Sequence, residues 1–300
     1  MDFLQPRSFP EALQAKAERP EALPIAGGTD VMVELNFDRG RPAAVLDLTR
    51  IPELAAWDRD DGRLRVGAAV TYSRAIAELA GPLPGLAIAA RTVGSPQIRN
   101  RGTVGGNLGS ASPAGDCHPP LLATGAEVEV ASAAGSRRIP VGEFFTGPKR
   151  SALRDDELIA AVHVPAAAGP QQFAKVGTRN AMVIAVCSFA IALDPEHGRV
   201  GTGIGSAGPT PLRAVQAERF LEGVLDEEGL WASRAALADA VAARFGELAG
   251  QAARPIDDVR GTAAYRVHAL GVLARRTLAW AWDQYRNGRR GPGNPRGVPR

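Results

Sequence analysis

The chain contains little of what metal clusters and disulfide scaffolds require. Cys117 and Cys187 are the only cysteines among 300 residues, and two thiols in a chain of this length indicate a reduced compartment rather than a disulfide framework. An iron–sulfur cluster takes about four cysteine ligands, so the chain cannot hold one alone. The four histidines also lack the spacing of metal ligands, and we therefore predict no metal site.

Long apolar runs and N-terminal targeting patterns are also missing. The longest apolar run covers residues 181–193, whereas a membrane-spanning helix needs roughly 20 residues. Residues 1–6 lack the basic and then apolar pattern of a signal peptide. We therefore expect a cytoplasmic protein with no membrane span.

The net charge of +3 comes from the C-terminal end of the chain. Five arginines lie at or after residue 286 with no acidic residue after Asp283, so removing them from the total leaves −2. A nucleic-acid-binding surface needs Lys and Arg clustered on one face. We therefore predict no nucleic-acid partner for the body. DNA binding by the Arg-rich tail is an alternative that deletion of residues 286–300 would test.

The order of the hydrophobic patterns predicts two domains. In the first, short strands alternate with helices, which is typical of an α/β arrangement. In the second, apolar strands precede helices, which is typical of α+β. A linker rich in Pro and Ala at 165–170 separates the two. We expect an α+β protein overall, with domains at 1–168 and 169–287 and a disordered tail at 288–300.

Periodicity and turn residues place the individual elements. The first domain is expected to contain helices at 10–17, 31–35, 71–79, 86–92 and 119–124, a strand ending at 25, and strands at 43–48, 63–66, 126–131, 137–140 and 158–164. The second is expected to contain strands at 172–176, 183–193 and 199–205, then helices at 212–221, 229–244 and 262–287. Asp60-Asp61-Gly62 predicts a hairpin turn. Residues 94–115 are too rich in Gly, Ser and Pro for regular structure and predict a functional loop.

Two glycine pairs are the most informative short segments. The first, Ala26-Gly27-Gly28-Thr29-Asp30, precedes Val31 and the helix at 31–35, which Thr29 or Asp30 can cap. The second, Thr103-Val104-Gly105-Gly106-Asn107, lies inside the irregular 94–115 segment. Paired glycines allow sharp turns with bare N–H groups, which form an anion-binding concavity, so two such turns can hold one diphosphate from both sides. Neither matches the Gly-x-Gly-x-x-Gly or the Gly-Lys-Ser/Thr pattern, and a nicotinamide Rossmann site is not predicted.

Asp116 and Lys175 are candidates for further ligand contacts. The Asp116 carboxylate, close behind the second turn, can accept hydrogen bonds from sugar hydroxyls, or it can cap a helix at Pro119. The Lys175 ammonium can favour the reduced, anionic form of an electron-rich ring, or it can be an ordinary solvated lysine. Cys117 is interpreted as a passive buried thiol, with a reactive thiol as the alternative, and His118 as a helix-start histidine. No Ser-His-Asp order, paired-carboxylate motif or nucleophile elbow is present, so no catalytic residue is predicted.

Five motifs occur in a characteristic order along the chain. They are residues 26–30, 97–107, 111–116 (Ala-Ser-Pro-Ala-Gly-Asp), 208–214 (Gly-Pro-Thr-Pro-Leu-Arg-Ala) and 255–266 (Pro-Ile-Asp-Asp-Val-Arg-Gly-Thr-Ala-Ala-Tyr-Arg). With these motifs the chain resembles the FAD-binding medium subunit of molybdenum hydroxylases, the family of xanthine dehydrogenase and aerobic carbon monoxide dehydrogenase. The resemblance extends over about residues 1–285.

This resemblance implies a fold and a cofactor site. The fold would be a vanillyl-alcohol-oxidase (PCMH) type FAD domain of two α/β subdomains, followed by a small antiparallel sheet with a helix bundle. FAD would be noncovalent, because no residue matches a known pattern for covalent attachment. The two turns would hold the diphosphate, and Ile159 and Lys175 would reach the flavin end. The implied cofactor-binding residues are Ala26, Gly27, Gly28, Thr29, Asp30, Val31, Thr103, Gly105, Gly106, Asn107, Asp116, Ile159 and Lys175.

The resemblance also implies partners. Substrate would be oxidised at a molybdopterin cofactor on a large subunit, and electrons would pass through [2Fe–2S] clusters on a small subunit to the FAD held here, then to NAD or another acceptor. A dimer of heterotrimers is expected. One alternative is a stand-alone FAD oxidase on the same fold, which turnover of a small alcohol or amine by the purified chain would favour. Another is a non-redox nucleotide-binding or assembly protein, which failure to bind FAD would favour.

Overall fold

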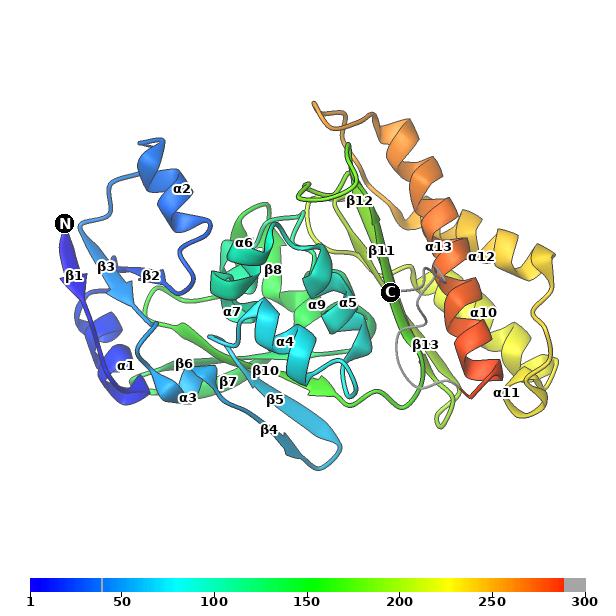
Figure 1. The fold of residues 1–300 in the computed structure, drawn as a ribbon, viewed down its shortest axis with the longest axis horizontal. Coiled ribbons are helices and arrows are strands. Elements are labelled where there is room, and N and C mark those ends of the chain that lie inside the picture. The colour runs from blue at the N-terminus through cyan, green and yellow to red at the C-terminus, as the bar shows by residue number, and fades with distance from the viewer. Residues whose placement is uncertain (39, 289–300) are drawn as a thin grey trace.

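The computed structural model describes residues 1–38 and 40–288 of the chain. The tail expected at 288–300 lies outside the described residues apart from Gly288. A five-stranded sheet carries a layer of helices, and a three-stranded sheet lies between that layer and the C-terminal helices (Figure 1). Within the described ranges, no helix is long and apolar enough to cross a membrane.

A small parallel sheet forms the N-terminal subdomain. Its elements are β1 (Asp2–Leu4), α1 (Phe9–Glu18), β2 (Leu23–Ile25), α2 (Val31–Asn36) and β3 (Ala44–Asp47). The strand order is β1-β3-β2, which sets Ile25 beside Asp47 at the carboxyl edge. The Ser8 side chain begins α1 by accepting a hydrogen bond from the Glu11 N–H. The first glycine turn follows the carboxyl end of β2, and open α/β sheets bind ligands at this edge.

The five-stranded antiparallel sheet is the centre of the first domain. Its strands are β4 (Trp57–Asp60), β5 (Arg63–Gly67), β6 (Glu127–Ser132), β7 (Gly135–Pro140) and β10 (Leu158–Pro165), in the order β4-β5-β10-β6-β7. The predicted hairpin turn joins β4 to β5, and Asp61 and Gly62 take the positive φ values of a type I′ turn, 42° and 74°. Alternation along β5 buries Leu64 and Val66 in the core and leaves Arg65 on the other face.

Helices cover one face of this sheet (Figure 1). The remaining elements of the first domain are α3 (Pro52–Ala55), α4 (Tyr72–Glu78), α5 (Pro84–Thr92), α6 (Pro96–Arg101), α7 (Val104–Ser110), α8 (His118–Ala123), α9 (Val141–Phe144), β8 (Phe145–Gly147) and β9 (Arg150–Ser151). The expectation of an irregular segment at 94–115 is therefore wrong. Ser95 and Thr103 each cap a short helix, and the cap at Thr103 offsets the low helix propensity of the glycines in α7.

The C-terminal part consists of an antiparallel sheet and helices, so the predicted fold class is confirmed. Its elements are β11 (Gln171–Val176), β12 (Cys187–Asp194), β13 (Arg199–Gly205), α10 (Val215–Glu227), α11 (Leu230–Ser233), α12 (Asp239–Ala252) and α13 (Ala263–Arg286). The Thr262 side chain caps α13 by accepting a hydrogen bond from the Tyr265 N–H, and the helix begins where the sequence predicts. One face of α13 packs on the sheet through Leu270, Leu273 and Leu278.

Three expected bounds in this part are wrong. The strand expected at 183–193 begins only at Cys187, because residues 177–186 form a loop. The helix expected at 212–221 begins at Val215, because Leu212 pairs with Ile204 in an isolated bridge. The helix expected at 229–244 is broken, because Gly229 and Arg234 take positive φ values of 61° and 52°.

Glycines bring the second sheet into direct contact with the first domain. A Cβ atom built on Gly201 or Gly203 of β13 would collide with the backbone carbonyls of Ala123 or Pro119 in α8. Beside this contact, Phe173 of β11 packs against the small side chains of Ala89, Ala123 and Ala190. The close approach fixes β11, which carries Lys175, against the helices of the first domain.

Gly203→Val is expected to weaken this contact. The added side chain has no space against the Pro119 carbonyl, so we expect the free energy of unfolding to fall by about 3 kcal/mol, as overpacking does. Gly223→Val in α10 is the matched control, because a Cβ there has no atom within 4 Å. Urea unfolding of both variants measures the difference, and equal stabilities would show that the contact is not tight.

Candidate functional site

The first glycine turn leaves its backbone N–H groups free. In the part of the chain that the structure describes, no hydrogen bond uses the N–H group of any residue from Gly27 to Val31. Gly28 has a φ of 75°, which favours glycine. The predicted side-chain cap of α2 is absent, because Asp30 already has helical backbone angles. These N–H groups are therefore available to an anion.

The second glycine turn has a different chemistry. Its residues form the first turn of α7, where the Gly105 N–H donates to the Ala68 carbonyl at 2.9 Å and the Gly106 N–H donates to Thr103 Oγ1 at 2.9 Å. The Asn107 N–H donates to the Thr103 carbonyl. The prediction of bare N–H groups at this turn is wrong, because Thr103 and the Ala68 carbonyl, which follows β5, accept their hydrogen bonds.

The structure brings the two turns together although about 75 residues separate them in the sequence. A Cβ atom on Gly27 would lie 2.9 Å from the Gly102 nitrogen and would collide with the Arg101 carbonyl. The backbone of the first turn therefore contacts the residues immediately before Thr103. Gly27 is required for this contact, because no other residue leaves the space.

The exposed face of α7 lacks side chains. Gly106 and Gly109 are both exposed, and residues three apart lie on the same side of a helix. A Cβ on Gly106 would meet only Thr103 Oγ1 within 4 Å, and one on Gly109 only Ile159 Cδ1 at 3.7 Å. Beside them, Asn107 Oδ1 is buried without a hydrogen-bond partner. The face thus offers space for a ligand and a polar atom to bind it.

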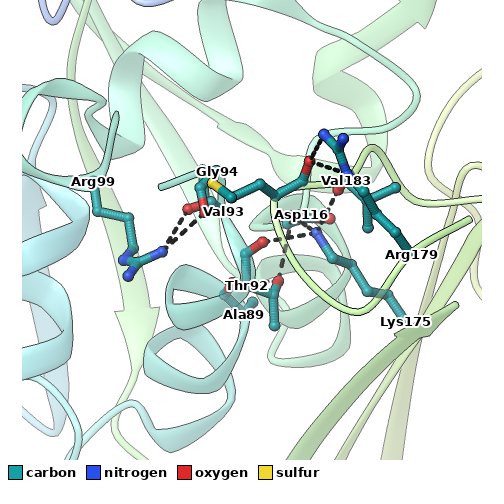
Figure 2. A network of polar contacts seen from close by, with 10 residues as sticks. Ala89, Thr92, Val93, Gly94, Arg99, Asp116, Lys175, Arg179 and Val183 are labelled. Atoms are coloured by element: carbon teal, nitrogen blue, oxygen red, sulfur yellow. Dashed lines mark hydrogen bonds and ion pairs between the residues drawn. The ribbon is translucent and has the colours of Figure 1, made fainter. Parts of the chain in front are cut away.

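Lys175 and Asp116 form a buried ion pair across the two domains (Figure 2). Lys175 Nζ lies 2.5 Å from Asp116 Oδ2, and it also donates to the carbonyls of Thr92 at 2.9 Å and Val183 at 3.1 Å. Each side chain of the pair is only 9% exposed. These contacts exclude the alternative of an ordinary solvated lysine. Arg99 holds the end of α5 nearby by donating to the carbonyls of Val93 and Gly94.

One oxygen of the Asp116 carboxylate has no hydrogen-bond partner. Its Oδ2 accepts hydrogen bonds from Lys175 and from Thr92 Oγ1, whereas its Oδ1 is buried without a partner. Burial raises the pKa of the Asp116 carboxyl, and the Lys175 ammonium opposes that rise. The expected alternative of a helix cap is not found, because α8 has no side-chain cap.

Cys117 and His118 have structural positions. Burial raises the pKa of the Cys117 thiol, so the residue is the passive buried thiol expected from the sequence. His118 Nε2 donates to the Asn107 carbonyl at 3.0 Å, and its ring lies 4.5 Å from that of Phe145. The imidazole therefore holds the middle of α7 in place.

We expect His118 to make stability depend on pH. Burial lowers its pKa from 6.5 to about 4, so between these values the unfolded chain binds a proton that the folded chain excludes. The free energy of unfolding should therefore fall by about 3 kcal/mol as the pH drops from 6.5 to 4. Urea unfolding across this range measures the slope. A His118→Gln variant should lose the share of the slope that His118 contributes, and an unchanged slope would contradict the assignment.

Sequence reasoning missed two contacts of the ion pair. Thr92 and Val183 contribute backbone carbonyls, which every residue type carries, so no sequence signal could identify them. Gly109 was also missed, but its spacing of three residues from Gly106 was a usable signal. The structure places Ile159 against the glycine face of α7, and it pairs Lys175 of the second domain with Asp116 of the first.

A second charged region lies away from this site. A cavity of about 830 Å³ on the polar face of the five-stranded sheet has a lining rich in arginine. Arg65 pairs with Glu129 at 2.9 Å, and Arg137 pairs with Glu157 at 2.7 Å, so internal partners satisfy much of its charge. Among the described residues, no group of three His, Cys, Asp or Glu side chains is placed to hold a metal ion.

Two family models match the chain. Residues 1–167 match the model described as FAD binding domain in molybdopterin dehydrogenase, and residues 172–281 match the CO dehydrogenase flavoprotein C-terminal domain. The chain is 30% identical to the xanthine dehydrogenase FAD-binding subunit of Escherichia coli O157:H7 over 284 residues, which covers 90% of this chain and 92% of that protein.

Solved structures agree with this match. Quinoline 2-oxidoreductase from Pseudomonas putida 86 superimposes with a TM-score of 0.86 and 26% identity, over 95% of this chain and 98% of that chain. Carbon monoxide dehydrogenase from Hydrogenophaga pseudoflava superimposes with a TM-score of 0.85 and 26% identity, over the same shares. The chain therefore belongs to the family of FAD-binding subunits of molybdenum-containing hydroxylases, as the resemblance predicted, and is an oxidoreductase subunit.

Proposed function

We propose that the chain binds one FAD noncovalently and transfers electrons from [2Fe–2S] clusters of a partner subunit to an external acceptor such as NAD. The observation that carries this proposal is the set of binding groups at the predicted positions. Free N–H groups lie at the first turn, α7 has a face without side chains, and a buried ammonium lies beside Asp116. A dinucleotide fits these groups, because its central diphosphate would take the free N–H groups and its reducible ring would take the ammonium.

The diphosphate end is assigned to the two turns. Residues 26–31 would donate their free N–H groups to the phosphate oxygens. The opposite wall would be Thr103, Gly105, Gly106 and Asn107, which contribute space and the Asn107 side chain rather than backbone donors. This division explains why glycine is needed at both turns for different reasons.

The flavin end is assigned to Asp116, Ile159 and Lys175. The bound flavin supplies the capacity to accept electrons and pass them on. Lys175 provides a fixed positive charge that favours the reduced, anionic ring, Asp116 Oδ1 accepts a hydrogen bond, and Ile159 gives an apolar wall. None of these residues takes part in bond making, so the chain acts by positioning and electrostatics.

The domain division and the assembly belong to the same proposal. We assign residues 1–168 to FAD binding and residues 169–287 to the C-terminal domain that supplies Lys175. A large molybdopterin subunit and a small [2Fe–2S] subunit would complete a dimer of heterotrimers, since two cysteines cannot hold a cluster. Both cysteines are free thiols, which supports a cytoplasmic location.

Purification of the tagged chain from its native host tests this assembly. We expect it to copurify with one subunit that contains molybdopterin and another that contains [2Fe–2S] clusters, both detected by metal analysis. The isolated chain should not oxidise the substrate of the complex. Purification as a lone flavoprotein that turns over a small alcohol or amine would instead support the stand-alone oxidase.

A further inference from the structure

Arg266 is a buried cation that no proposed cofactor contact explains. It lies in the first turns of α13 and is only 4% exposed. Its Nη1 donates to the carbonyls of Val186 at 3.0 Å and Ser206 at 2.6 Å, and its Nη2 lies 2.5 Å from Asp258 Oδ1. Burial of a guanidinium carries a large desolvation penalty, so three specific acceptors are needed to offset it.

The first carbonyl belongs to the loop at residues 177–186. The Val186 N–H donates to the Val176 carbonyl at 2.7 Å, which closes this loop at its base. Within the loop, the Val183 carbonyl accepts a hydrogen bond from Lys175 Nζ at 3.1 Å, and Arg179 donates to the Met182 carbonyl (Figure 2). Arg266 therefore anchors the end of a loop that covers the Lys175 ammonium.

The second carbonyl lies at the seam between the domains. Ser206 has a φ of 57°, a left-handed conformation that is unfavourable for a residue with a Cβ. Its N–H donates to the Pro113 carbonyl at 2.9 Å, and Pro113 lies three residues before Asp116. The hydrogen bonds from Arg266 and to Pro113 hold Ser206 in this conformation on both sides.

We propose that Arg266 is a positioning residue for the flavin end of the site. Through Val186 it fixes the loop over Lys175, and through Ser206 it fixes the segment that carries Asp116. Asp258 orients the guanidinium, and Gly261 lets the 255–261 segment pack beside Val186, where a Cβ would lie 3.2 Å from Val186 Cγ1. The inference rests on the proposed FAD site and gives the 255–266 motif a role.

Arg266→Lys and Arg266→Gln in the full chain test this inference. Lysine keeps the charge but cannot reach all three acceptors, so we expect the FAD dissociation constant to rise about tenfold and the flavin midpoint potential to fall. Glutamine should give larger changes in both. Arg213→Gln is the control, because it breaks another ion pair of the same domain, 2.6 Å from the exposed Arg213 to the buried Glu218, without a contact to the site.

The outcomes separate the possible explanations. FAD affinity and midpoint potential equal to those of Arg213→Gln would overturn the inference and leave Arg266 as a purely structural residue. If the Arg266 variants do not fold, Asp258→Asn tests the inference instead, because it keeps the guanidinium but removes the carboxylate that binds it. An unchanged flavin midpoint potential in Asp258→Asn would also overturn the inference. A wild-type chain that binds no FAD would refute the proposed function itself.

Discussion

Gly106→Val is expected to abolish FAD retention in a chain that still folds. Gly106 is exposed on α7, and an added side chain would fill the space assigned to the diphosphate and displace the Thr103 cap. We expect affinity to fall by about 100-fold or more, which corresponds to roughly 2.7 kcal/mol. The FAD content of the purified variant, measured from its visible absorbance, tests this. A yellow variant with one FAD per chain would remove the second turn from the site.

Two glycine variants serve as controls for this experiment. Gly81→Val adds the same side chain at a position with no atom within 4 Å, so FAD content should be unchanged. Gly105→Val should instead reduce stability, because a Cβ there would lie 2.5 Å from the Ala68 Cβ atom. The comparison separates the loss of a binding surface from the loss of packing.

Lys175→Met is expected to lower both the stability and the flavin midpoint potential. The variant leaves the buried Asp116 carboxylate without its cation, which should reduce the free energy of unfolding by about 3 kcal/mol. Loss of the positive charge beside the ring should lower the potential by about 30 mV or more, the equivalent of a tenfold change for a two-electron couple. Chemical unfolding and a spectroscopic redox titration measure the two effects.

A double variant separates these effects. Lys175→Met with Asp116→Asn removes the unpaired charge, so stability should recover while the midpoint potential stays low. A potential that returns to the wild-type value would show that the ammonium acts through Asp116 rather than on the flavin. A potential unchanged in Lys175→Met itself would confine Lys175 to a structural ion pair.

The sequence predicted the elements that follow from local rules. The Asp61-Gly62 turn and the long helix that starts at about 262 are local features, and the structure confirms them. The loop at 177–186, which replaces the start of an expected strand, and the interruption of an expected helix at Arg234 depend on tertiary contacts and on positive φ values. Residue types do not indicate either of these. Residues 94–115 contain two short helices despite their glycine content, because the side chains of Ser95 and Thr103 cap them.

The same distinction applies to the site. Motifs selected both turns, Asp116 and Lys175, but they did not show which N–H groups are free. The free groups lie at the first turn, because the second donates to Ala68 and Thr103. The ion pair between Lys175 and Asp116 joins residues 59 apart, and this pairing follows from the contact between β13 and α8 rather than from any local pattern.

Titration of the purified full chain with FAD tests the central claim most directly. The account predicts one FAD per chain, with a flavin absorbance spectrum, and release of intact FAD after acid denaturation because no covalent bond is formed. A colourless chain that does not bind FAD at any concentration tested would contradict the assignment of the two turns and the Lys175 region to one cofactor.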